Sequence, residues 1–309
     1  MAAEPVSLQK WALAAGVALM VAWGVNFAIT KVVLAELGVW PFLFIRFLAM
    51  PLAGFALLLA ITRRHFPRTW PRRGDLARFV AAGLIGHTAH VSLVMWGINL
   101  STAFSSSLVL TSSPLWTLLI LALLGAEKLR RRQLIGTLIA FAGIVVFLSD
   151  KFVAGFALAG AGDLVLLVAA SLFSLYTVIT KPLVERYGPL NVMCYSLLFG
   201  APPLVLATLP AFLDAPLAAV PAGVWFGVFW AVAVSSFLGW IVWAWVNSVR
   251  GLARSAPLQY LMPPIAGLVA WLTLGETFTW LKIAGALAAM AGIAWAQSGA
   301  PSKTPPDAG

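Results

Sequence analysis

Two histidines in this sequence are candidates for metal binding or hydrogen bonding. His87 and His90 stand three positions apart, so in a helix they would share one face and could offer two ligands to a metal ion. No third His, Cys or carboxylate stands near them in the sequence, and the single cysteine, Cys194, lies in an apolar stretch. The pattern therefore favours hydrogen-bonding or cavity-lining roles, and it predicts neither a metal site nor a cofactor.

Two cations, Lys31 and Arg46, lie within apolar segments, where an isolated charge is costly. A long basic side chain can extend to the lipid headgroups while its stem stays in apolar surroundings, which explains Lys31 about as well as a functional role does. The functional alternatives are attraction of an anionic group, such as an amino-acid carboxylate, or an ion pair of Lys31 with Glu36. Lys181 follows the same Ile-Thr pair as Lys31 and predicts an equivalent site toward the cytoplasm.

Trp23, Asn26 and Phe27 recur at helical spacing and predict one face with an amide in its middle. An amide at mid-membrane depth needs a partner, which is either another helix or a solute. Aromatic and polar residues from other segments could complete the lining of a cavity. The further candidates for this substrate site are His90, Trp96, Asn99, Tyr176 and Tyr260. Simple packing is the alternative role for such an aromatic stripe.

Prolines interrupt two of the apolar segments. Pro114 stands in the middle of one, and the pair Pro263 and Pro264 stands in another. Proline lacks a backbone N–H and clashes with the preceding turn, so it bends or interrupts a helix. Matched interruptions in corresponding helices often mark the central site of a transporter. We therefore expect these prolines to kink helices that line or gate a pathway.

The segments that carry these residues are long and apolar. Hydrophobic residues make up 61% of the 309 positions and charged residues only 10%, whereas a soluble domain carries about a quarter charged residues. A helix needs about 20 apolar residues to span a bilayer. We therefore expect an all-α integral membrane protein of ten transmembrane helices, with the lipid bilayer as its surroundings. The expected helices are 12–34, 41–61, 78–99, 102–124, 133–149, 163–184, 190–210, 221–247, 255–274 and 280–298.

Basic residues gather in the connectors on one side of these segments. If the N-terminus is cytoplasmic, that side holds 16 of the 20 Lys and Arg residues. Cytoplasmic loops are the ones that collect such residues, so the asymmetry predicts that both termini are cytoplasmic. It also explains the net charge of +10 without nucleic acid as a partner.

Self-similarity divides the chain into two halves. Ile29-Thr30-Lys31 returns 150 positions later as Ile179-Thr180-Lys181. The other matched pairs, some after a slip of one residue, are Pro114 and Pro264, Gly125 and Gly275, Glu127 and Glu276, Gly136 and Gly285, and Gly143 and Gly292. Five helices per half is an odd number, so the second copy must cross the membrane in reverse. We expect two inverted five-helix repeats at 1–150 and 151–300, with a disordered tail at 301–309.

The sequence contains few of the motifs that couple transport to an energy source. No Gly-rich loop ending in Gly-Lys-Ser/Thr is present, so we expect no ATP hydrolysis. All ten acidic residues fall outside the expected helices or at their ends. Proton-driven pumps commonly carry an ionisable relay inside the membrane, so this distribution favours facilitated diffusion or coupling through the histidines over carboxylate-based proton coupling.

The joint order of these motifs resembles the ten-helix EamA family of the drug/metabolite transporter superfamily over nearly the whole chain. The residues that carry the resemblance are Trp23-Gly24, Asn26-Phe27, Lys31, Pro41, Phe44, Arg46, Ser105 to Ser107, Pro114, Leu124 to Glu127, Gln133, Gly136, Gly143, Pro264, Leu274 to Glu276, Gly285 and Gly292. Ala126 departs from the family's usual Leu-Gly-Glu. The resemblance implies a bacterial inner-membrane exporter of amino acids, including the aromatic type, or of related small metabolites.

The main functional expectation is therefore export of a carboxylate-bearing solute by alternating access, as a secondary carrier or facilitator and not as an enzyme. A multidrug-type or other metabolite permease of the same fold is the alternative. A membrane-embedded enzyme would need clustered His, Asp or Glu residues on one membrane side, which the sequence lacks, and a channel or sensor fits matched halves less well. The sequence does not determine the oligomeric state, for which a monomer is one expectation.

Overall fold

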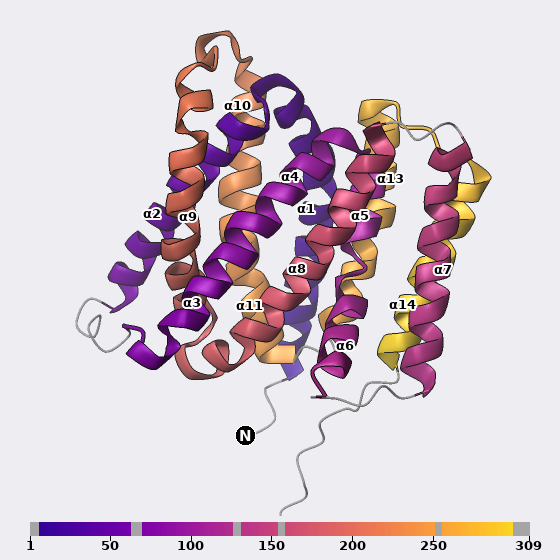
Figure 1. Ribbon diagram of the computed structural model, residues 1–309, viewed down its shortest axis with the longest axis horizontal. Coiled ribbons are helices and arrows are strands. Elements are labelled where there is room, and N and C mark those ends of the chain that lie inside the picture. Colours follow the sequence, from indigo (N-terminus) through magenta and orange to yellow (C-terminus); the bar gives the residue numbers. More distant parts are fainter. Residues whose placement is uncertain (1–5, 63–69, 126–130, 154–157, 251–254, 299–309) are drawn as a thin grey trace, which may run out of the picture.

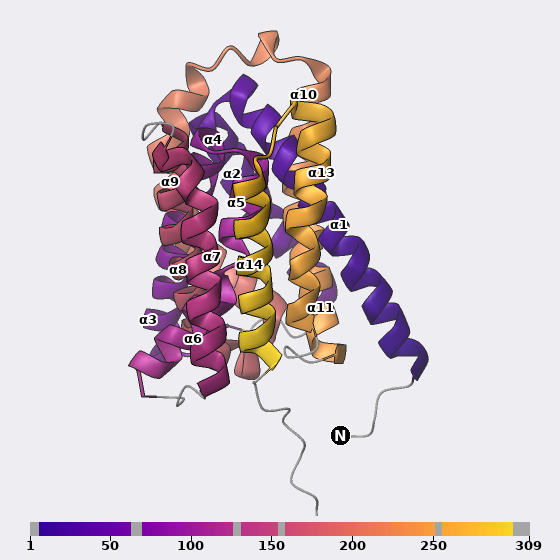
Figure 2. The ribbon, with the colours of Figure 1, turned by 90° about the vertical axis from the view of Figure 1, so that its right-hand side faces the viewer.

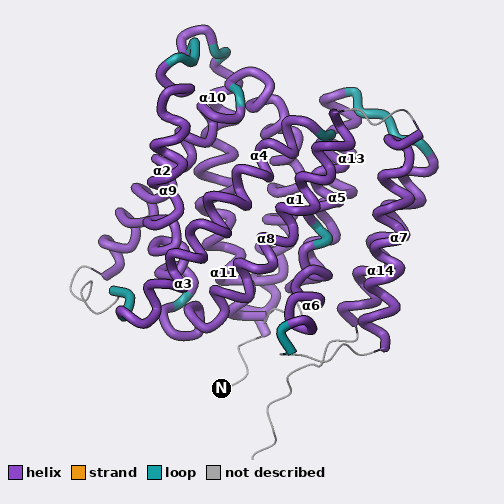
Figure 3. Tube along the Cα trace, in the orientation of Figure 1, coloured by secondary structure: helices purple, strands orange, loops and turns teal. Residues whose placement is uncertain are grey.

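Helix is the secondary structure throughout the described part of the chain. The computed structural model describes residues 6–62, 70–125, 131–153, 158–250 and 255–298, and no strand occurs within these ranges (Figure 3). A backbone in lipid must satisfy its own hydrogen bonds, and a helix does so within one segment. The all-α class expected from the sequence is confirmed. The expected tail at 301–309 lies outside the described residues.

The helices of the first half run between the two ends of the bundle and lie among those of the second half (Figure 1). Their bounds are α1 Val6–Leu37, α2 Val39–Thr62, η2 Arg73–Asp75, α3 Leu76–Ala82, η3 Gly83–Ala89, α4 His90–Leu100, α5 Ala103–Leu110, α6 Ser113–Leu123 and α7 Arg131–Val153. η2, α3, η3 and α4 follow one another without a gap and together make one crossing.

The second half contains a corresponding series of helices (Figure 1). The bounds are α8 Leu158–Tyr187, α9 Pro189–Leu213, η4 Leu217–Ala219, α10 Ala222–Phe229, η5 Trp230–Leu238, α11 Gly239–Arg250, η6 Ala256–Leu261, α13 Met262–Leu274 and α14 Trp280–Ser298. α10, η5 and α11 again form one continuous crossing.

Eight helical stretches of the described residues are long and apolar enough to cross a membrane. Two shorter apolar helices, Leu258–Leu274 and Trp280–Ala296, occupy the places of the expected ninth and tenth spans. The ninth begins inside a 3₁₀ segment, η6, and Gly275, with a φ of 66°, ends it in the left-handed conformation. The structure therefore fits a multi-pass membrane protein and is compatible with ten crossings.

The fourth span, expected at 102–124, is found at Ala103–Leu123, and it is broken in its middle. α5 ends at Leu110, a turn at Thr111 and Ser112 follows, and α6 starts beside Pro114. Pro114 has no N–H to offer the carbonyl of Leu110, and the Ser113 hydroxyl donates to that oxygen instead, at 2.6 Å. The sequence expectation that Pro114 interrupts a helix is thus confirmed. Pro263 likewise stands at the start of α13, directly after η6.

The third and eighth spans each contain a π-helical segment in their middle. η3 covers Gly83–Ala89 and η5 covers Trp230–Leu238, so the two segments overlap when the chain is shifted by 150 positions. A π-segment adds a residue to the helical turn and is frequently found at functional sites. In both spans it lies directly before the residues that meet at the centre of the bundle.

Contacts between helices are reciprocal between the two halves. α8 packs on η3 and α4, while α1 packs on η5 and α11; α2 packs on α9, and α7 packs on α14 (Figure 2). The α7–α14 contact brings backbones together, since a Cβ atom on Gly143 would lie 2.3 Å from Ala289 N and one on Gly292 would lie 2.3 Å from Ala140 N. Glycine is therefore required where these helices meet.

Candidate functional site

Five ring side chains from three spans meet near the middle of the bundle, and we call them the ring cluster. They are His87 of η3, His90 of α4, Phe173 and Tyr176 of α8, and Trp240 of α11. The ring centroid of His87 lies 5.5 Å from that of Tyr176 and 5.9 Å from that of Trp240. Those of His90 and Phe173 are 5.2 Å apart, and Trp240 lies 6.4 Å from Phe173. These distances are typical of interacting aromatic rings.

The close approach of α8 to η3 depends on Gly86. A Cβ atom at this position would lie 2.1 Å from Cδ2 of Tyr176, which is far inside van der Waals contact. Only glycine therefore lets the Tyr176 ring lie flat against η3 and reach Trp240, whose ring centroid is 6.3 Å away.

Replacing Gly86 with alanine is expected to lower transport by about tenfold, because the added methyl group must push Tyr176 out of the ring cluster and overpacking of this kind costs about 1–3 kcal/mol. Transport by the purified protein in proteoliposomes measures the effect. Gly223→Ala is the matched control, since a Cβ there would have no heavy atom within 4 Å. Unchanged transport by the Gly86 variant would show that Tyr176 has no functional role at this place.

Hydrogen bonds fix the two histidine rings. Ser196 Oγ donates its proton to the Val192 carbonyl at 2.6 Å, so Nε2–H of His87 is the donor in the 2.9 Å contact with Ser196 Oγ. His90 Nδ1 lies 2.9 Å from the Ala169 carbonyl oxygen, which can only accept. In the neutral rings, Nδ1 of His87 and Nε2 of His90 are then acceptors. Within the described residues no group of three His, Cys, Asp or Glu side chains could hold a metal ion.

Arg46 on α2 is a buried cation beside this cluster. Its side chain is 8% exposed, and its Nε is buried without a hydrogen-bond partner. Its positive charge acts on both His87 and His90, so the guanidinium lies near the two rings. No carboxylate of the described residues is ion-paired with it. A buried charge without a counterion is strongly unfavourable, so this position is suited to an anion that the protein itself does not provide.

An unpaired amide oxygen lies on α1. Oδ1 of Asn26 is buried and has no hydrogen-bond partner. One turn earlier, Nε1 of Trp23 donates to the Ser235 carbonyl of η5 at 2.8 Å, and its ring centroid lies 5.9 Å from that of Trp243. α1 is thereby fixed against the eighth span, and Asn26 remains as an acceptor for a donor group.

Lys31 does not pair with Glu36, which is exposed. Its ammonium donates to three carbonyl oxygens at the end of α4, those of Ile98, Asn99 and Ser101, at 3.0, 2.5 and 2.6 Å. A cation is favourable there because the C-terminal end of a helix carries unpaired carbonyls and partial negative charge. The structure thus gives Lys31 a capping role, in which Asn99 takes part through its backbone.

Asp163 lies near the start of its helix, as expected of the acidic residues, but it is buried. It stands in the second turn of α8, and its side chain is fully buried. The Ser101 hydroxyl donates to its carboxylate. Asp163, Ser101 and Lys31 therefore form one polar network between α1, the end of α4 and α8.

The remaining sequence candidates are not among the five residues of the ring cluster. Trp96 is 49% exposed on the surface, and Lys181 is exposed as well. Tyr260 packs against a separate apolar cluster that includes Leu115 and Ile293, with its hydroxyl buried and without a partner. Phe27 packs against the large core cluster between α2 and α9.

A second charged contact closes the end of the bundle near the N-terminus. Asp75 is 4% exposed, and its Oδ2 accepts from Arg186 Nη1 at 2.5 Å and from the Tyr187 hydroxyl at 2.7 Å. The Tyr187 hydroxyl in turn accepts from the backbone N–H of Arg72 at 3.0 Å. These contacts join the start of the third span to the end of α8.

The sequence profile of the EamA-like transporter family matches residues 10–149 and 160–296. The chain belongs to this family. Two EamA-type segments thus account for nearly all of the described residues, and the family resemblance inferred from the motifs is confirmed.

Relatives of this EamA protein include proteins named as probable exporters and efflux pumps. A protein of Streptantibioticus cattleyicolor named "Probable terminal-alkyne amino-acid exporter" is 30% identical over 93% of each chain. Proteins of Salmonella typhimurium and Escherichia coli named "Probable amino-acid metabolite efflux pump" are each 25% identical over 89% of this chain and 90% of theirs. A crystal structure of another protein superposes with a TM-score of 0.62 over 93% of this chain and 97% of that one, and at 19% identity it shows the fold alone.

Trp240 and Ser196 of this EamA protein are not among the site residues expected from the sequence. The repeat contained the missing signal: 150 positions separate Trp240 from His90, and the same offset separates Ser196 from Arg46. In each pair, the two residues hold corresponding positions in the two halves, and both lie in or beside the ring cluster. The family and its relatives identify the protein as a membrane transporter, not as an enzyme.

Proposed function

We propose that this protein exports amino acids or closely related carboxylate-bearing metabolites across a bacterial inner membrane. The observation that carries the proposal is Arg46, a buried guanidinium without a carboxylate partner among the described residues, beside the ring cluster. A carboxylate from the solute would neutralise that charge and accept from its N–H groups. The names of the exporting relatives agree with this class of solute.

A zwitterionic solute would also find a place for its ammonium group. The unpaired Oδ1 of Asn26 can accept from an ammonium N–H, and aromatic faces such as that of Trp240 attract cations. The side chain of the solute would lie against the rings of Phe173 and Tyr176. Recognition of both charged groups would distinguish amino acids from apolar drugs, which is why we favour amino acids over the multidrug alternative.

We infer that the carrier alternates by means of two inverted halves. In support, α1 and α8 run in opposite directions: Ser101 contacts Lys31 near the end of α1 and Asp163 near the start of α8 (Figure 1). The matched π-segments and reciprocal helix contacts also support two related halves. Such halves can exchange roles at the two membrane faces. With no nucleotide motif in the sequence, the carrier is secondary or facilitative, and we propose that it acts as a monomer.

Transport in proteoliposomes tests the proposed function. The purified protein should catalyse saturable uptake of radiolabelled aromatic or aliphatic amino acids, and unlabelled amino acid on the inside should accelerate that uptake by counterflow. The rates should be compared with and without a proton gradient, since coupling could run through the histidines. Uptake without saturation or counterflow would indicate a channel, and transport of uncharged drugs but not amino acids would indicate the permease alternative.

The proposed orientation predicts the labelling of two engineered cysteines. With Cys194 changed to serine, Leu124→Cys should react only from the cytoplasm and Thr277→Cys only from the outside, because the connectors after the fourth and ninth spans would face opposite sides. Leu124 is 65% exposed and Thr277 is exposed, so both sites are accessible to a maleimide. Labelling of both cysteines from one side of intact cells would contradict inverted halves.

A further inference from the structure

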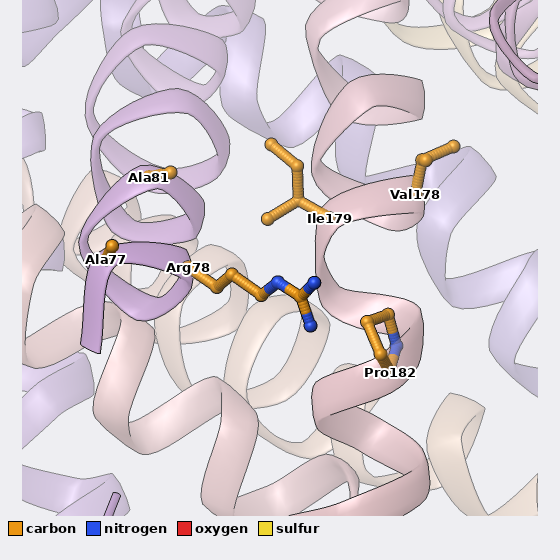
Figure 4. A pocket seen from close by; sticks show the side chains of 6 residues that line it. All are labelled: Ala77, Arg78, Ala81, Val178, Ile179 and Pro182. Atoms are coloured by element: carbon orange, nitrogen blue, oxygen red, sulfur yellow. The ribbon is translucent and has the colours of Figure 1, made fainter. Parts of the chain in front are cut away.

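A groove between α3 and α8 opens on the surface of the bundle, near the end where the N-terminus lies (Figure 4). Its volume is about 350 Å³. The lining consists of Ala77, Arg78 and Ala81 from α3 and of Val178, Ile179 and Pro182 from α8. The side chains of the two alanines are small, so α3 leaves room for the groove. The lining is apolar except for one charged residue, Arg78.

Arg78 extends across this groove and places its guanidinium beside Ile179 and Pro182 (Figure 4). The acid closest in sequence, Asp75, is held by Arg186 and the Tyr187 hydroxyl. Glu185 on α8 is exposed and forms no ion pair with Arg78. The positive charge of Arg78 is therefore available to an anion from outside the protein.

Pro182 also lines this groove. It stands inside α8 and has no N–H, so the carbonyl of Val178, four residues earlier, lacks its usual helical donor. An occupant that carries both an anionic group and a hydroxyl could meet the guanidinium and this carbonyl together. The apolar lining requires that the same occupant also carry hydrocarbon.

We propose that an anionic phospholipid, such as phosphatidylglycerol, binds in this groove with its phosphate on Arg78 and an acyl chain along Ala81 and Ile179. Arg78 lies in the first turn of α3, near the end of the third span that the proposed orientation places at the cytoplasmic headgroups, and basic pockets between spans at that face bind anionic headgroups. Inorganic phosphate would leave the apolar lining uncovered. The lipid joins α3 to α8, the two elements already linked by Asp75 and Arg186, and it thereby stabilises the packing of the third and sixth spans.

Thermal unfolding in lipid nanodiscs tests the site. We expect the Tm of the wild-type protein to be higher in mixed phosphatidylglycerol and phosphatidylcholine than in phosphatidylcholine alone, and this difference to disappear in Arg78→Gln. Lys10→Gln is the matched control, because it removes an exposed cation at the same end of the bundle and should keep the lipid effect. Ala77→Phe, which fills the groove and leaves the charge, should also abolish it.

Native mass spectrometry of the same variants gives an independent measure of binding. The wild type and Lys10→Gln should retain a phosphatidylglycerol adduct that Arg78→Gln loses. An equal lipid effect in Arg78→Gln would overturn the proposal and indicate general surface electrostatics. Stabilisation of the detergent-solubilised wild type by inorganic phosphate as large as that by phosphatidylglycerol would overturn it as well, because the site would then be one for a free anion. Neither measurement depends on whether the protein transports amino acids.

Discussion

Replacing Arg46 with glutamine is expected to reduce amino-acid transport by at least about tenfold, since loss of one partner from a buried charged hydrogen bond costs about 2–5 kcal/mol and 1.4 kcal/mol corresponds to a factor of ten. The thermal stability of the empty protein should stay the same or rise. A guanidinium that is 8% exposed and lacks a counterion destabilises the folded state, and a neutral amide removes that charge. Initial rates in proteoliposomes and Tm values in detergent measure the two effects.

Two further variants separate the charge of Arg46 from its shape. Arg46→Lys keeps the positive charge but loses the planar fork, so transport should be intermediate between the wild type and Arg46→Gln. Lys181→Gln removes an exposed cation and should leave transport unchanged. If Arg46→Gln transported normally while Lys181→Gln did not, the anion site would be at the exposed position and not beside the ring cluster.

Changing Pro114 and Pro264 together to alanine is expected to lower the transport rate by about tenfold with little effect on substrate affinity. Alanine restores an N–H at each of the two positions, so α5 can continue into α6 and the start of α13 gains a backbone donor, which makes both places less easily bent. Turnover then slows because the barrier between the outward and inward states rises. Rates of counterflow and the substrate concentration at half-saturation measure rate and affinity separately.

Pro210→Ala supplies the control for the double proline variant. Pro210 lies inside α9, away from the breaks of the fourth and ninth spans, and its replacement should leave turnover unchanged. Normal counterflow by the double variant at normal expression would show that these prolines shape the helices without gating the pathway.

Length and apolarity predicted most of the helices, because each span must carry about 20 apolar residues between polar connectors. The tenth helix, expected at 280–298, was found at Trp280–Ser298. The break at Pro114 was also predicted, since proline acts on its own backbone. The π-segment η3 was not, because no local pattern marks its extra residue; η3 packs against α8 and α9, and the sequence does not reveal such contacts.

The sequence predicts a site residue where a charged side chain stands in an otherwise apolar segment. Arg46 and Lys31 gave the same signal in the sequence, yet one lies unpaired beside the ring cluster and the other caps the end of α4. The difference is tertiary, because it depends on which carbonyls or rings another span brings near the charge. The hydrogen bond between His87 and Ser196, which are 109 positions apart, could not be predicted for the same reason.

Binding of a solute to the detergent-solubilised protein tests the central assignment most directly, and the tryptophans near the site provide the signal. Trp240 belongs to the ring cluster, and Trp23 and Trp243 contact each other beside Asn26. An amino acid should change the tryptophan fluorescence with saturation in the wild type and not in Arg46→Gln, and the methyl ester of the same amino acid should bind neither. Equal binding of the acid and its ester to both proteins would contradict a carboxylate site at Arg46.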